Sequence, residues 1–328
     1  MIPDISQSGK PSKSEEVITD APAVMMQGVT KQYGHIHALN GISLAISGGV
    51  TGILGSNGAG KSTLFKLMVG RIRANQGSIR LFGQDPWKNP GVYSRIGYVP
   101  EHEKMHDWMT ALDFITTFAR LHGLTRDEAR SEAERVLNFV DLGDVMDRQI
   151  GRFSKGMRQR VKIAHALVND PELIILDEPL AGCDPLARTT IMNVIRELGR
   201  TGKTILVSSH ILHEIERITE QIVILHKGRL IAFGNLHAIR ELLDAHPHTI
   251  RLTTDNPKEL AKKVLDIQSV KGVTLAGNGV LDIQTHDLGK THSKLPSLIV
   301  NSGIGVEGID NPDDDLEHIL HFLTGGAA

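Results

Sequence analysis

The chain has 328 residues, of which 40% are hydrophobic and 23% charged, so it suits one large globular domain or two smaller ones. A formal net charge of −2 and only 4% aromatic residues disfavour a nucleic-acid-binding surface, and the single cysteine, Cys183, excludes an intrachain disulfide and fits a reducing compartment. Residues 1–23 are rich in Ser, Pro, Lys and Glu, which predicts a disordered polar tail and not a signal peptide. Residues 38–60 carry no charge, but their seven glycines disfavour membrane insertion, so any membrane role would come through a partner.

The earliest chemical motif is a glycine-rich loop between a predicted strand and a predicted helix. Residues 50–54 are an apolar run typical of a buried strand, and residues 63–69 place apolar side chains at helical spacing. The loop fits the phosphate-binding pattern Gly, four residues, Gly-Lys-Ser/Thr, with the residues Gly55, Ser56, Asn57, Gly58, Ala59, Gly60, Lys61, Ser62 and Thr63. We predict that its amides bind nucleotide phosphate, that Lys61 reaches the β- and γ-phosphates, and that Ser62 holds Mg²⁺. A plain glycine-rich turn before a helix is the alternative, which the flanking elements disfavour.

Residues 24–232 alternate between predicted strands and helices, as in an α/β domain. Apolar stretches predict further strands at residues 42–46, 78–82, 97–99, 173–176, 204–208 and 221–225. Residues 111–121 are amphipathic, and Thr125 followed by Glu128 forms a capping-box pattern that opens a second helix. We therefore expect a helical insert at about residues 101–170 within a phosphate-loop core.

The strand predicted at residues 173–176 ends in two carboxylates, Asp177 and Glu178, followed by Pro179. In phosphate-loop NTPases an acid at this position holds Mg²⁺, which suits Asp177. Its neighbour Glu178 is placed to orient or deprotonate an attacking water. Ordinary polar residues at a strand end are the alternative interpretation.

The α/β pattern ends near residue 235, and a different order of elements follows. Residues 249–253 alternate, Asn256-Pro257 opens a predicted helix, and two weak strands follow at about residues 272–285. A further helix then precedes another strand. This order indicates a small α+β region of βαββαβ-like arrangement, which is followed by an amphipathic run at residues 316–323.

The phosphate loop, the helical insert and Leu176-Asp177-Glu178-Pro179 together resemble the ATPase subunits of ATP-binding-cassette (ABC) transporters over about residues 24–234. The resemblance implies a phosphate-loop NTPase core of ABC type, with an antiparallel β subdomain and an inserted helical subdomain. The family signature is Leu-Ser-Gly-Gly-Gln at a helix start, which Ser154 and Gly156 match. Lys155 and Met157 depart from the signature. A serine hydroxyl and free amides at a helix N-terminus still form an anion site, which in the family caps the γ-phosphate of ATP held by a second copy.

The resemblance assigns roles to four further residues. His210 fits the switch histidine that contacts the γ-phosphate, although a histidine after a strand is often only a polar cap. Asp184 fits the loop that crosses the dimer interface, although an aspartate before a proline is also an ordinary helix start. Tyr33 is placed to stack on adenine, the alternative being a surface tyrosine. Glu101 replaces the family's glutamine, and its carboxylate can still ligate Mg²⁺ or a water.

Glu101 and the Ser-Lys-Gly-Met signature resemble exporter ATPases whose membrane subunits are separate chains, and residues 316–325 resemble the terminal helix of that group. The resemblance implies ATP hydrolysis with ATP and Mg²⁺, and two copies that sandwich the nucleotide. It also implies an integral membrane permease as partner and a cytoplasmic location on the inner face of the cell membrane. Met105, Trp108 and Met109 either line the groove that receives the permease or pack locally.

Other functions are weighed against this one. A non-transport ABC ATPase acting on nucleic acid or the ribosome usually carries two cassettes, a long coiled coil or zinc-binding cysteines, and the sequence has none of these, so no nucleic-acid partner is expected. A regulatory module without turnover is disfavoured by the complete set of Lys61, Asp177, Glu178 and His210. The histidines show no structural zinc spacing. We divide the chain into a polar tail (1–23), an ABC ATPase domain (24–235) and a C-terminal accessory domain (236–328).

Overall fold

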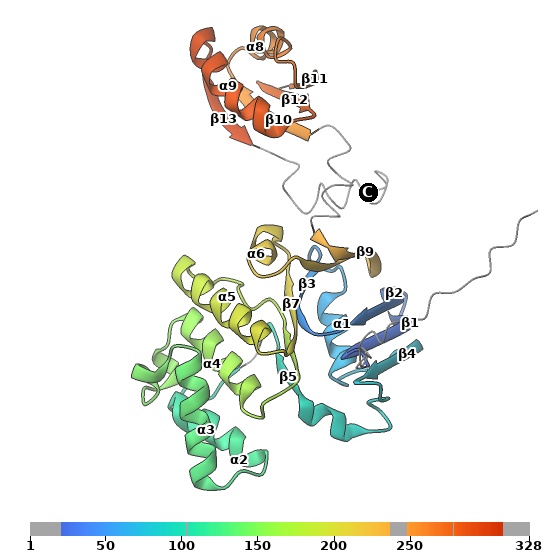
Figure 1. Ribbon diagram of the computed structural model, residues 1–328, viewed down its shortest axis with the longest axis vertical. Helices are drawn as coiled ribbons and strands as arrows, with labels where there is room; N and C mark the ends of the chain where they lie inside the picture. Colours follow the sequence, from blue (N-terminus) through green and yellow to red (C-terminus); the bar gives the residue numbers. More distant parts are fainter. Residues whose placement is uncertain (1–20, 103, 237–247, 278, 311–328) are drawn as a thin grey trace, which may run out of the picture.

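The computed structural model describes residues 21–102, 104–236, 248–277 and 279–310 (Figure 1). The largest sheet has six strands in the order β5-β6-β7-β3-β8-β9. They are β5 (Ile96–Val99), β6 (Leu173–Leu176), β7 (Thr204–Ser209), β3 (Gly49–Leu54), β8 (Gln221–His226) and β9 (Arg229–Asn235). The first five run parallel, and β9 lies antiparallel to β8 at one edge.

The inner strands are apolar on both faces because both faces of the sheet are covered. On β6, Leu173 and Ile175 pack into a core that they share with α1 (Lys61–Met68). The alternate residues of β6 pack on the other face with α4 (Lys155–Leu167), α5 (Pro185–Arg200) and α6 (Leu212–Glu216). Because parallel strands end at one edge of a sheet, the residues that follow β3, β6 and β7 meet there.

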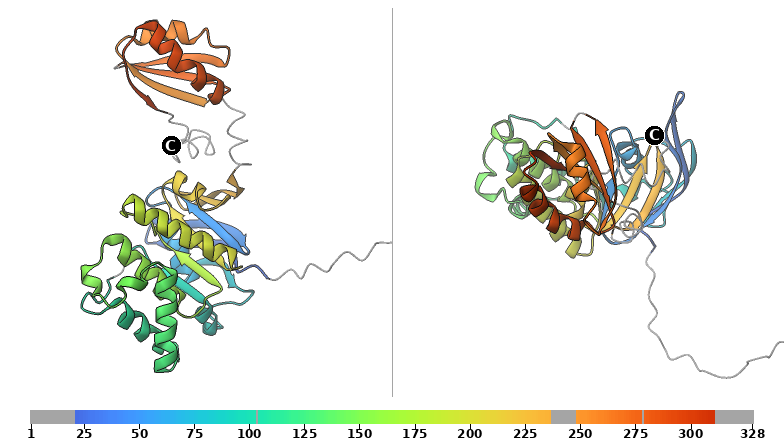
Figure 2. Two further views of the ribbon diagram at one scale, coloured as in Figure 1. Left: turned by 60° about the vertical axis from the view of Figure 1, so that its left-hand side comes forward. Right: turned by 90° about the horizontal axis from the view of Figure 1, so that it is seen from above.

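A smaller antiparallel sheet shares the core of α1. Its strands are β2 (Ile36–Ile46), β1 (Val24–Tyr33) and β4 (Gln76–Leu81), in that order. The pairing of β1 with β2 shifts register near Gly28, which has a φ of 58°. In Figures 1 and 2 these blue strands and the green helices lie on opposite sides of the molecule.

The green helices follow β5 in the chain and precede β6. They are α2 (Ala111–Leu121), α3 (Arg126–Phe139) and α4, and the short 3₁₀ helices η2 (Gly143–Val145) and η3 (Ile150–Arg152) lie between α3 and α4. A further 3₁₀ helix, η1 (Pro90–Arg95), lies between β4 and β5. The hydroxyl of Thr110 accepts a hydrogen bond from the Asp113 amide and caps α2. Thr125 and Glu128 form the capping box that the sequence predicts at the start of α3.

The C-terminal part of the described chain has a sheet and a core of its own. Its elements are β10 (His248–Thr254), α8 (Pro257–Val264), β11 (Val270–Gly277), β12 (Val280–Thr285), α9 (Leu288–Ser302) and β13 (Val306–Asp310), and the sheet order is β11-β12-β10-β13. The order along the chain is the predicted βαββαβ. Asn256 caps α8 by accepting a hydrogen bond from the Glu259 amide. The run predicted to be helical at residues 316–323 lies outside the described residues.

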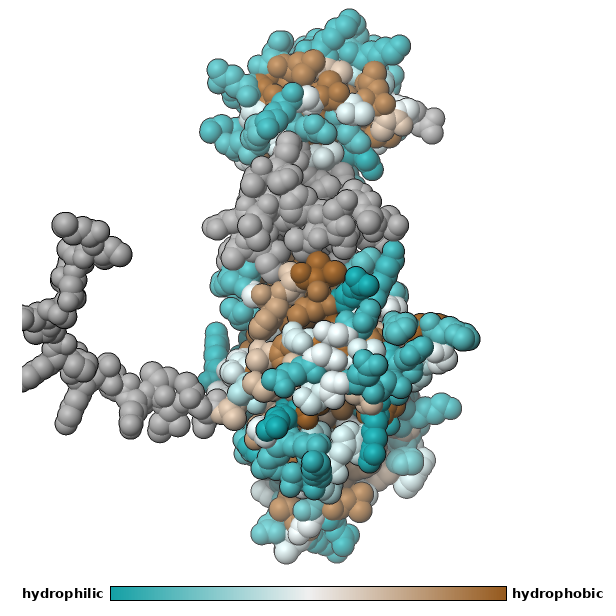
Figure 3. Space-filling model, turned by 90° about the vertical axis from the view of Figure 1, so that its right-hand side faces the viewer, coloured by the Kyte–Doolittle hydropathy of each residue, from teal (hydrophilic) through white to brown (hydrophobic). Residues whose placement is uncertain are grey.

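The predicted α/β fold class is confirmed, whereas β1 and β9 are strands that the sequence pattern does not predict. Among the described residues, no helix combines the length and the hydrophobicity needed to cross a membrane. On the face shown in Figure 3, hydrophilic residues separate small apolar areas of the described surface.

Candidate active site

The glycine-rich loop joins β3 to α1 in a shape that needs glycine at its two ends. A Cβ at Gly55 would lie 2.6 Å from the Leu225 carbonyl oxygen. Gly60 has a φ of 108°, and a Cβ there would lie 2.6 Å from the Ala38 carbonyl oxygen. Gly60 is also the N-cap of α1 and supplies no capping side chain. The loop therefore presents main-chain amides and a helix N-terminus, which together favour an anion.

This loop lines a cavity of about 650 Å³ at the carboxyl edge of the parallel strands. Carboxylates that follow two other strands reach the same cavity, and the start of β2 and the turn between β8 and β9 supply the rest of its wall. The lining residues are Ile36, His37, Ala38, Ser56, Asn57, Gly58, Ala59, Gly60, Lys61, Ser62, Thr63, Glu101, Glu178 and Lys227.

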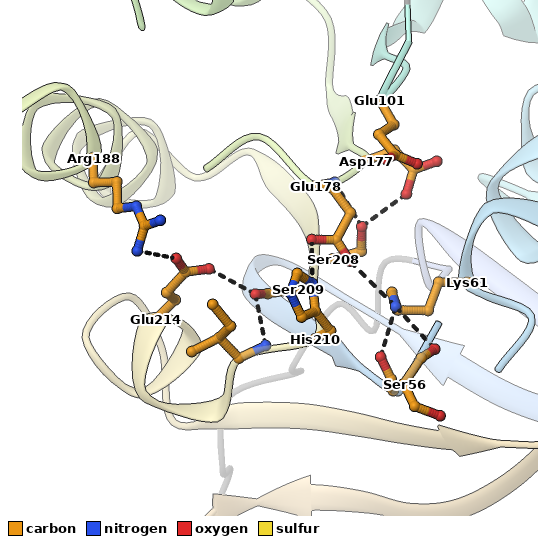
Figure 4. A network of polar contacts seen from close by, with 12 residues as sticks. Ser56, Lys61, Glu101, Asp177, Glu178, Arg188, Ser208, Ser209, His210 and Glu214 are labelled. Carbon is orange, nitrogen blue, oxygen red and sulfur yellow. Dashed lines mark hydrogen bonds and ion pairs between the residues drawn. The ribbon is translucent and has the colours of Figure 1, made fainter. Parts of the chain in front are cut away.

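Lys61 points into the loop that precedes it (Figure 4). Its Nζ donates to the carbonyl oxygens of Gly55 at 2.6 Å and Ser56 at 3.3 Å, and it lies 3.2 Å from Oε1 of Glu178. The side chain is only 6% exposed. The lysine charge is thus held at the loop by two carbonyls and one carboxylate.

Asp177 and Glu178 follow β6 and are tied to β7 by Ser208. The Ser208 hydroxyl donates to Oδ1 of Asp177 at 2.8 Å and accepts a hydrogen bond from the Glu178 amide at 2.8 Å. Asp177 is 2% exposed, and burial raises the pKa of its carboxyl. Hydrogen bonds from Ser208 and Ser62 oppose that rise, while the carboxylates of Glu101 and Glu178 add to it. Burial and the neighbouring carboxylates thus both disfavour the ionised form of Asp177.

Glu178 is the residue at which the other groups converge. One carboxylate oxygen faces Lys61, and the other lies 3.1 Å from Nδ1 of His210, which follows β7 (Figure 4). Its backbone has a φ of +50°, a region that glutamate rarely adopts. Such strain persists only where the surroundings impose it, and it occurs most often at functional sites.

The oxygen donors beside Glu178 fit a magnesium ion. Mg²⁺ binds carboxylate and hydroxyl oxygens, which Asp177, Ser62 and Glu101 provide. Glu101 lines the cavity with a side chain that is 44% exposed, and its carbonyl accepts a hydrogen bond from Lys162 at 3.2 Å. A divalent cation would favour the ionised form of Asp177, against the burial and the neighbouring carboxylates that raise its pKa.

Some predicted site residues do not line the cavity of a single chain. Gly55, Asp177 and His210 adjoin residues that line it. Ser154, Gly156 and Asp184 lie instead at the starts of α4 and α5. Ser154 caps α4 by accepting a hydrogen bond from the Met157 amide, and Asp184 caps α5 by accepting one from the Ala187 amide. Gly156 lies so close to α5 that a Cβ there would be 2.3 Å from Cβ of Ala187. None of Ser154, Gly156 and Asp184 lines the cavity.

Two aromatic residues singled out by the sequence are exposed. Tyr33 is 46% exposed, pairs with Ile36 across the β1–β2 hairpin, and has Nζ of Lys31 5.1 Å from its ring centroid. Ile36 lines the cavity, but Tyr33 does not. Trp108 is 72% exposed, whereas its neighbours Met105 and Met109 pack on the core of the helical segment.

The structure also shows polar residues that the sequence reasoning misses. Ser208 joins the two strand ends, and Ser209, Glu214 and Arg188 form a second group of contacts beside His210 (Figure 4). The two serines at the end of β7, which follow the apolar residues 205–207, are the sequence signal that could reveal the role of Ser208. The Arg188–Glu214 pair gives no local signal because 26 residues separate its members.

Comparisons with known proteins agree with this geometry. Residues 39–181 match a family described as ABC transporter. The ABC transporter ATP-binding protein NatA of Bacillus subtilis is 39% identical over 63% of this chain and 85% of its own length. Nod factor export ATP-binding protein I of Burkholderia orbicola is 36% identical over 66% of this chain and 71% of its own length. Among solved structures, a dimeric ATP-binding cassette in a post-hydrolysis state, bound to ADP and Pi, is similar with a TM-score of 0.59 at 25% identity, covering 65% of this chain and 98% of that one.

Proposed function

Because this chain belongs to the ATP-binding subunits of ABC transporters and is an ATP hydrolase, we propose that it powers an exporter whose membrane permease is a separate protein. The relative from Burkholderia orbicola is named for Nod factor export, which supports the outward direction. The observation that carries the proposed chemistry is Glu178, held between Lys61 and His210 beside the cavity.

The substrate phosphates occupy the loop between β3 and α1. The loop amides and the N-terminus of α1 bind the phosphate oxygens, and Ser62 and Asp177 would hold Mg²⁺ with Glu101 nearby. When bound, Mg²⁺ neutralises part of the charge that develops during phosphoryl transfer.

Lys61 and Glu178 exchange partners when ATP binds. The Lys61 ammonium moves its hydrogen bonds from the loop carbonyls and Glu178 to the β- and γ-phosphates. Glu178 is thereby free to accept a proton from water as that water attacks the γ-phosphorus. A new bond forms between the water oxygen and phosphorus, and the bond to the oxygen that bridges the β- and γ-phosphates breaks. His210, beside Glu178, contacts the γ-phosphate.

A second copy of the chain completes the site. Ser154, Gly156 and Asp184 lie at helix starts and do not line the cavity of their own chain, which supports their assignment to a nucleotide held by another copy. The dimeric form of the similar solved structure supports this arrangement. Closure of two copies around ATP, and reopening after hydrolysis, would be passed near Glu101 to a permease, with the chain on the inner face of the membrane.

The test of this proposal is Glu178→Gln. We expect hydrolysis to fall by about 100-fold or more because the proton acceptor is lost. ATP binding should persist, and a dimer should accumulate only when ATP is present. Phosphate release, nucleotide binding and size-exclusion chromatography with light scattering measure these quantities.

The matched control is Glu172→Gln, at the opposite end of β6, whose hydrolysis should stay within about twofold of the unmodified chain. Unchanged hydrolysis in Glu178→Gln would remove this residue from the mechanism. Loss of activity without any ATP-dependent dimer would refute the two-copy site.

A further inference from the structure

A chain of polar contacts joins the loop before α5 to the loop after β7, and the proposed chemistry does not use it (Figure 4). Arg188 donates from Nε to the Cys183 carbonyl oxygen at 3.2 Å, and its Nη1 lies 3.0 Å from Oε1 of Glu214. The other oxygen of Glu214 accepts a hydrogen bond from Ser209 Oγ at 2.7 Å. Ser209 Oγ in turn accepts one from the Ile211 amide at 3.0 Å.

Burial distinguishes this network from a surface ion pair. The Glu214 side chain is 9% exposed and Ser209 is 1% exposed, while Arg188 reaches them with a side chain that is 37% exposed. Removing one member of a buried pair leaves the other charged and without its partner, whereas exposed pairs contribute little. Both carboxylate oxygens of Glu214 are engaged, and Arg188 bonds at once to the loop before α5 and to α6, so the network links these two segments.

The two ends of the network adjoin two residues of the proposed site. Cys183 immediately precedes Asp184, which the two-copy arrangement places at the interface. Ser209 and Ile211 are the immediate neighbours of His210 on either side, and His210 touches Glu178. A displacement of the loop at Cys183 therefore reaches the peptide that carries His210 through three side chains, those of Arg188, Glu214 and Ser209.

We infer that Arg188 and Glu214 are positioning residues that couple the Asp184 loop to His210. The inference rests on the proposed function, because it needs a second copy at Asp184 and a role for His210 in hydrolysis. Seating of the second copy fixes the Asp184 loop, and the Arg188–Glu214 pair then holds His210 against Glu178. Hydrolysis is in this way made dependent on dimer closure.

The decisive experiment is a double-mutant cycle between Arg188→Met and His210→Ala. In the unmodified background we expect Arg188→Met to lower the rate of hydrolysis about tenfold, with nucleotide affinity unchanged within about twofold. In the His210→Ala background the same substitution should change the residual rate by less than about twofold, since the group that it positions is gone. Glu214→Gln should behave like Arg188→Met, and combining the two should cost little more than either alone.

The matched control is Arg200→Met on the same helix, whose pairing with Glu197 is exposed and should leave hydrolysis unchanged. Arg188→Lys keeps the charge but cannot bond both partners with a planar fork, so we expect partial recovery. Should Arg188→Met fail to fold, Ser209→Ala tests the same connection with a smaller loss, about threefold, that must also vanish in the His210→Ala background.

The outcomes separate the two proposals. If His210→Ala is severe but Arg188→Met lowers hydrolysis equally in both backgrounds, the network acts only on stability and the inference is overturned. If His210→Ala has no effect on hydrolysis, or the unmodified chain hydrolyses no ATP, the proposed function itself is refuted, whatever Arg188→Met does. A Glu178→Gln protein that also carries Arg188→Met should still form its ATP-dependent dimer, and loss of that dimer would contradict a coupling role.

Discussion

The two ends of the parallel strands differ in a way that identifies the site. A cavity of about 650 Å³ opens at the carboxyl end, and one of about 680 Å³ opens at the amino end beside Arg95, Asp170, Glu172 and Lys203. Cavity size therefore does not distinguish the two ends. The arrangement of charge does.

At the amino end each charge has its own partner in solvent. Arg95 pairs with Glu172 and Lys203 pairs with Asp170, with carboxylate side chains 56% and 83% exposed. These pairings lower the pKa of both carboxyls, chiefly through the hydrogen bonds that the cations donate. At the carboxyl end burial raises the pKa of Asp177 instead. Keeping a buried carboxylate ionised beside other carboxylates costs folding free energy, and such an arrangement is typical of a functional site.

Backbone strain alone is a weaker guide. Asp170 at the amino end has a φ of +45°, and Glu178 at the carboxyl end has a φ of +50°. Aspartate tolerates this region because its short side chain bonds locally, whereas glutamate has no such help. Phe82, which lines the amino-end cavity, also has a φ of +50°, so a positive φ does not by itself identify a functional residue.

The largest expected effect comes from replacing a lysine with alanine at each end of the parallel strands and comparing the two variants. Lys61→Ala should lower hydrolysis by at least about 100-fold, because a buried cation is removed from the place where phosphate charge develops. Lys203→Ala should leave hydrolysis within about twofold. Phosphate release at saturating ATP measures both, and equal losses would erase the distinction between the ends.

A smaller effect should appear in the stability of the nucleotide-free protein. The raised pKa of Asp177 means that folding favours its protonated form, so its ionised carboxylate costs stability at neutral pH. Asp177→Asn keeps an acceptor for Ser208 and should raise the free energy of unfolding at pH 7 by about 1 kcal/mol.

The gain from Asp177→Asn should shrink as the pH falls through the raised pKa of Asp177 and vanish below the ordinary pKa of aspartate, where the carboxyl is protonated in both the folded and the unfolded state. Urea unfolding at pH 7 and near pH 4 would measure it. Destabilisation by Asp177→Asn at pH 7 would show that the carboxylate is balanced in the empty site.

The smallest effect belongs to Glu172→Gln at the amino end. Its lowered pKa stabilises the fold above the ordinary pKa of glutamate, and this contribution is lost as the pH falls through the lowered value. Because the pair with Arg95 is largely exposed, we expect a loss of only about 0.5 kcal/mol at pH 7. Thermal unfolding at low and high salt would check it, and a loss that salt does not weaken would indicate a buried pair.

The elements that the sequence predicts are those with a continuous local pattern. The apolar run of β6 and the caps at Thr125 and Asn256 need no knowledge of the rest of the chain. The bulged strand β1 breaks its own alternation at Gly28, and β9 is a half-buried edge strand, so neither carries such a pattern.

The residues of the site likewise fall into those with a local sequence pattern and those without one. Lys61, Asp177, Glu178 and His210 follow from motifs at strand ends, because parallel strands bring those ends together. Which of their atoms meet depends on strand register and burial, so the Lys61–Glu178 contact and the Arg188–Glu214 pair emerge only in three dimensions. The cross-copy roles of Ser154 and Asp184, and the boundary near residue 235, stay predictions.

The close approach of Gly156 to Ala187 has a mechanical consequence. With room for no more than a hydrogen on one side and a methyl on the other, the first turns of α4 and α5 touch almost main chain to main chain. A side chain larger than hydrogen at position 156 would therefore push the first turns of α4 and α5 apart. The spacing between the serine-capped and the aspartate-capped terminus thus depends on the absence of a single methyl group.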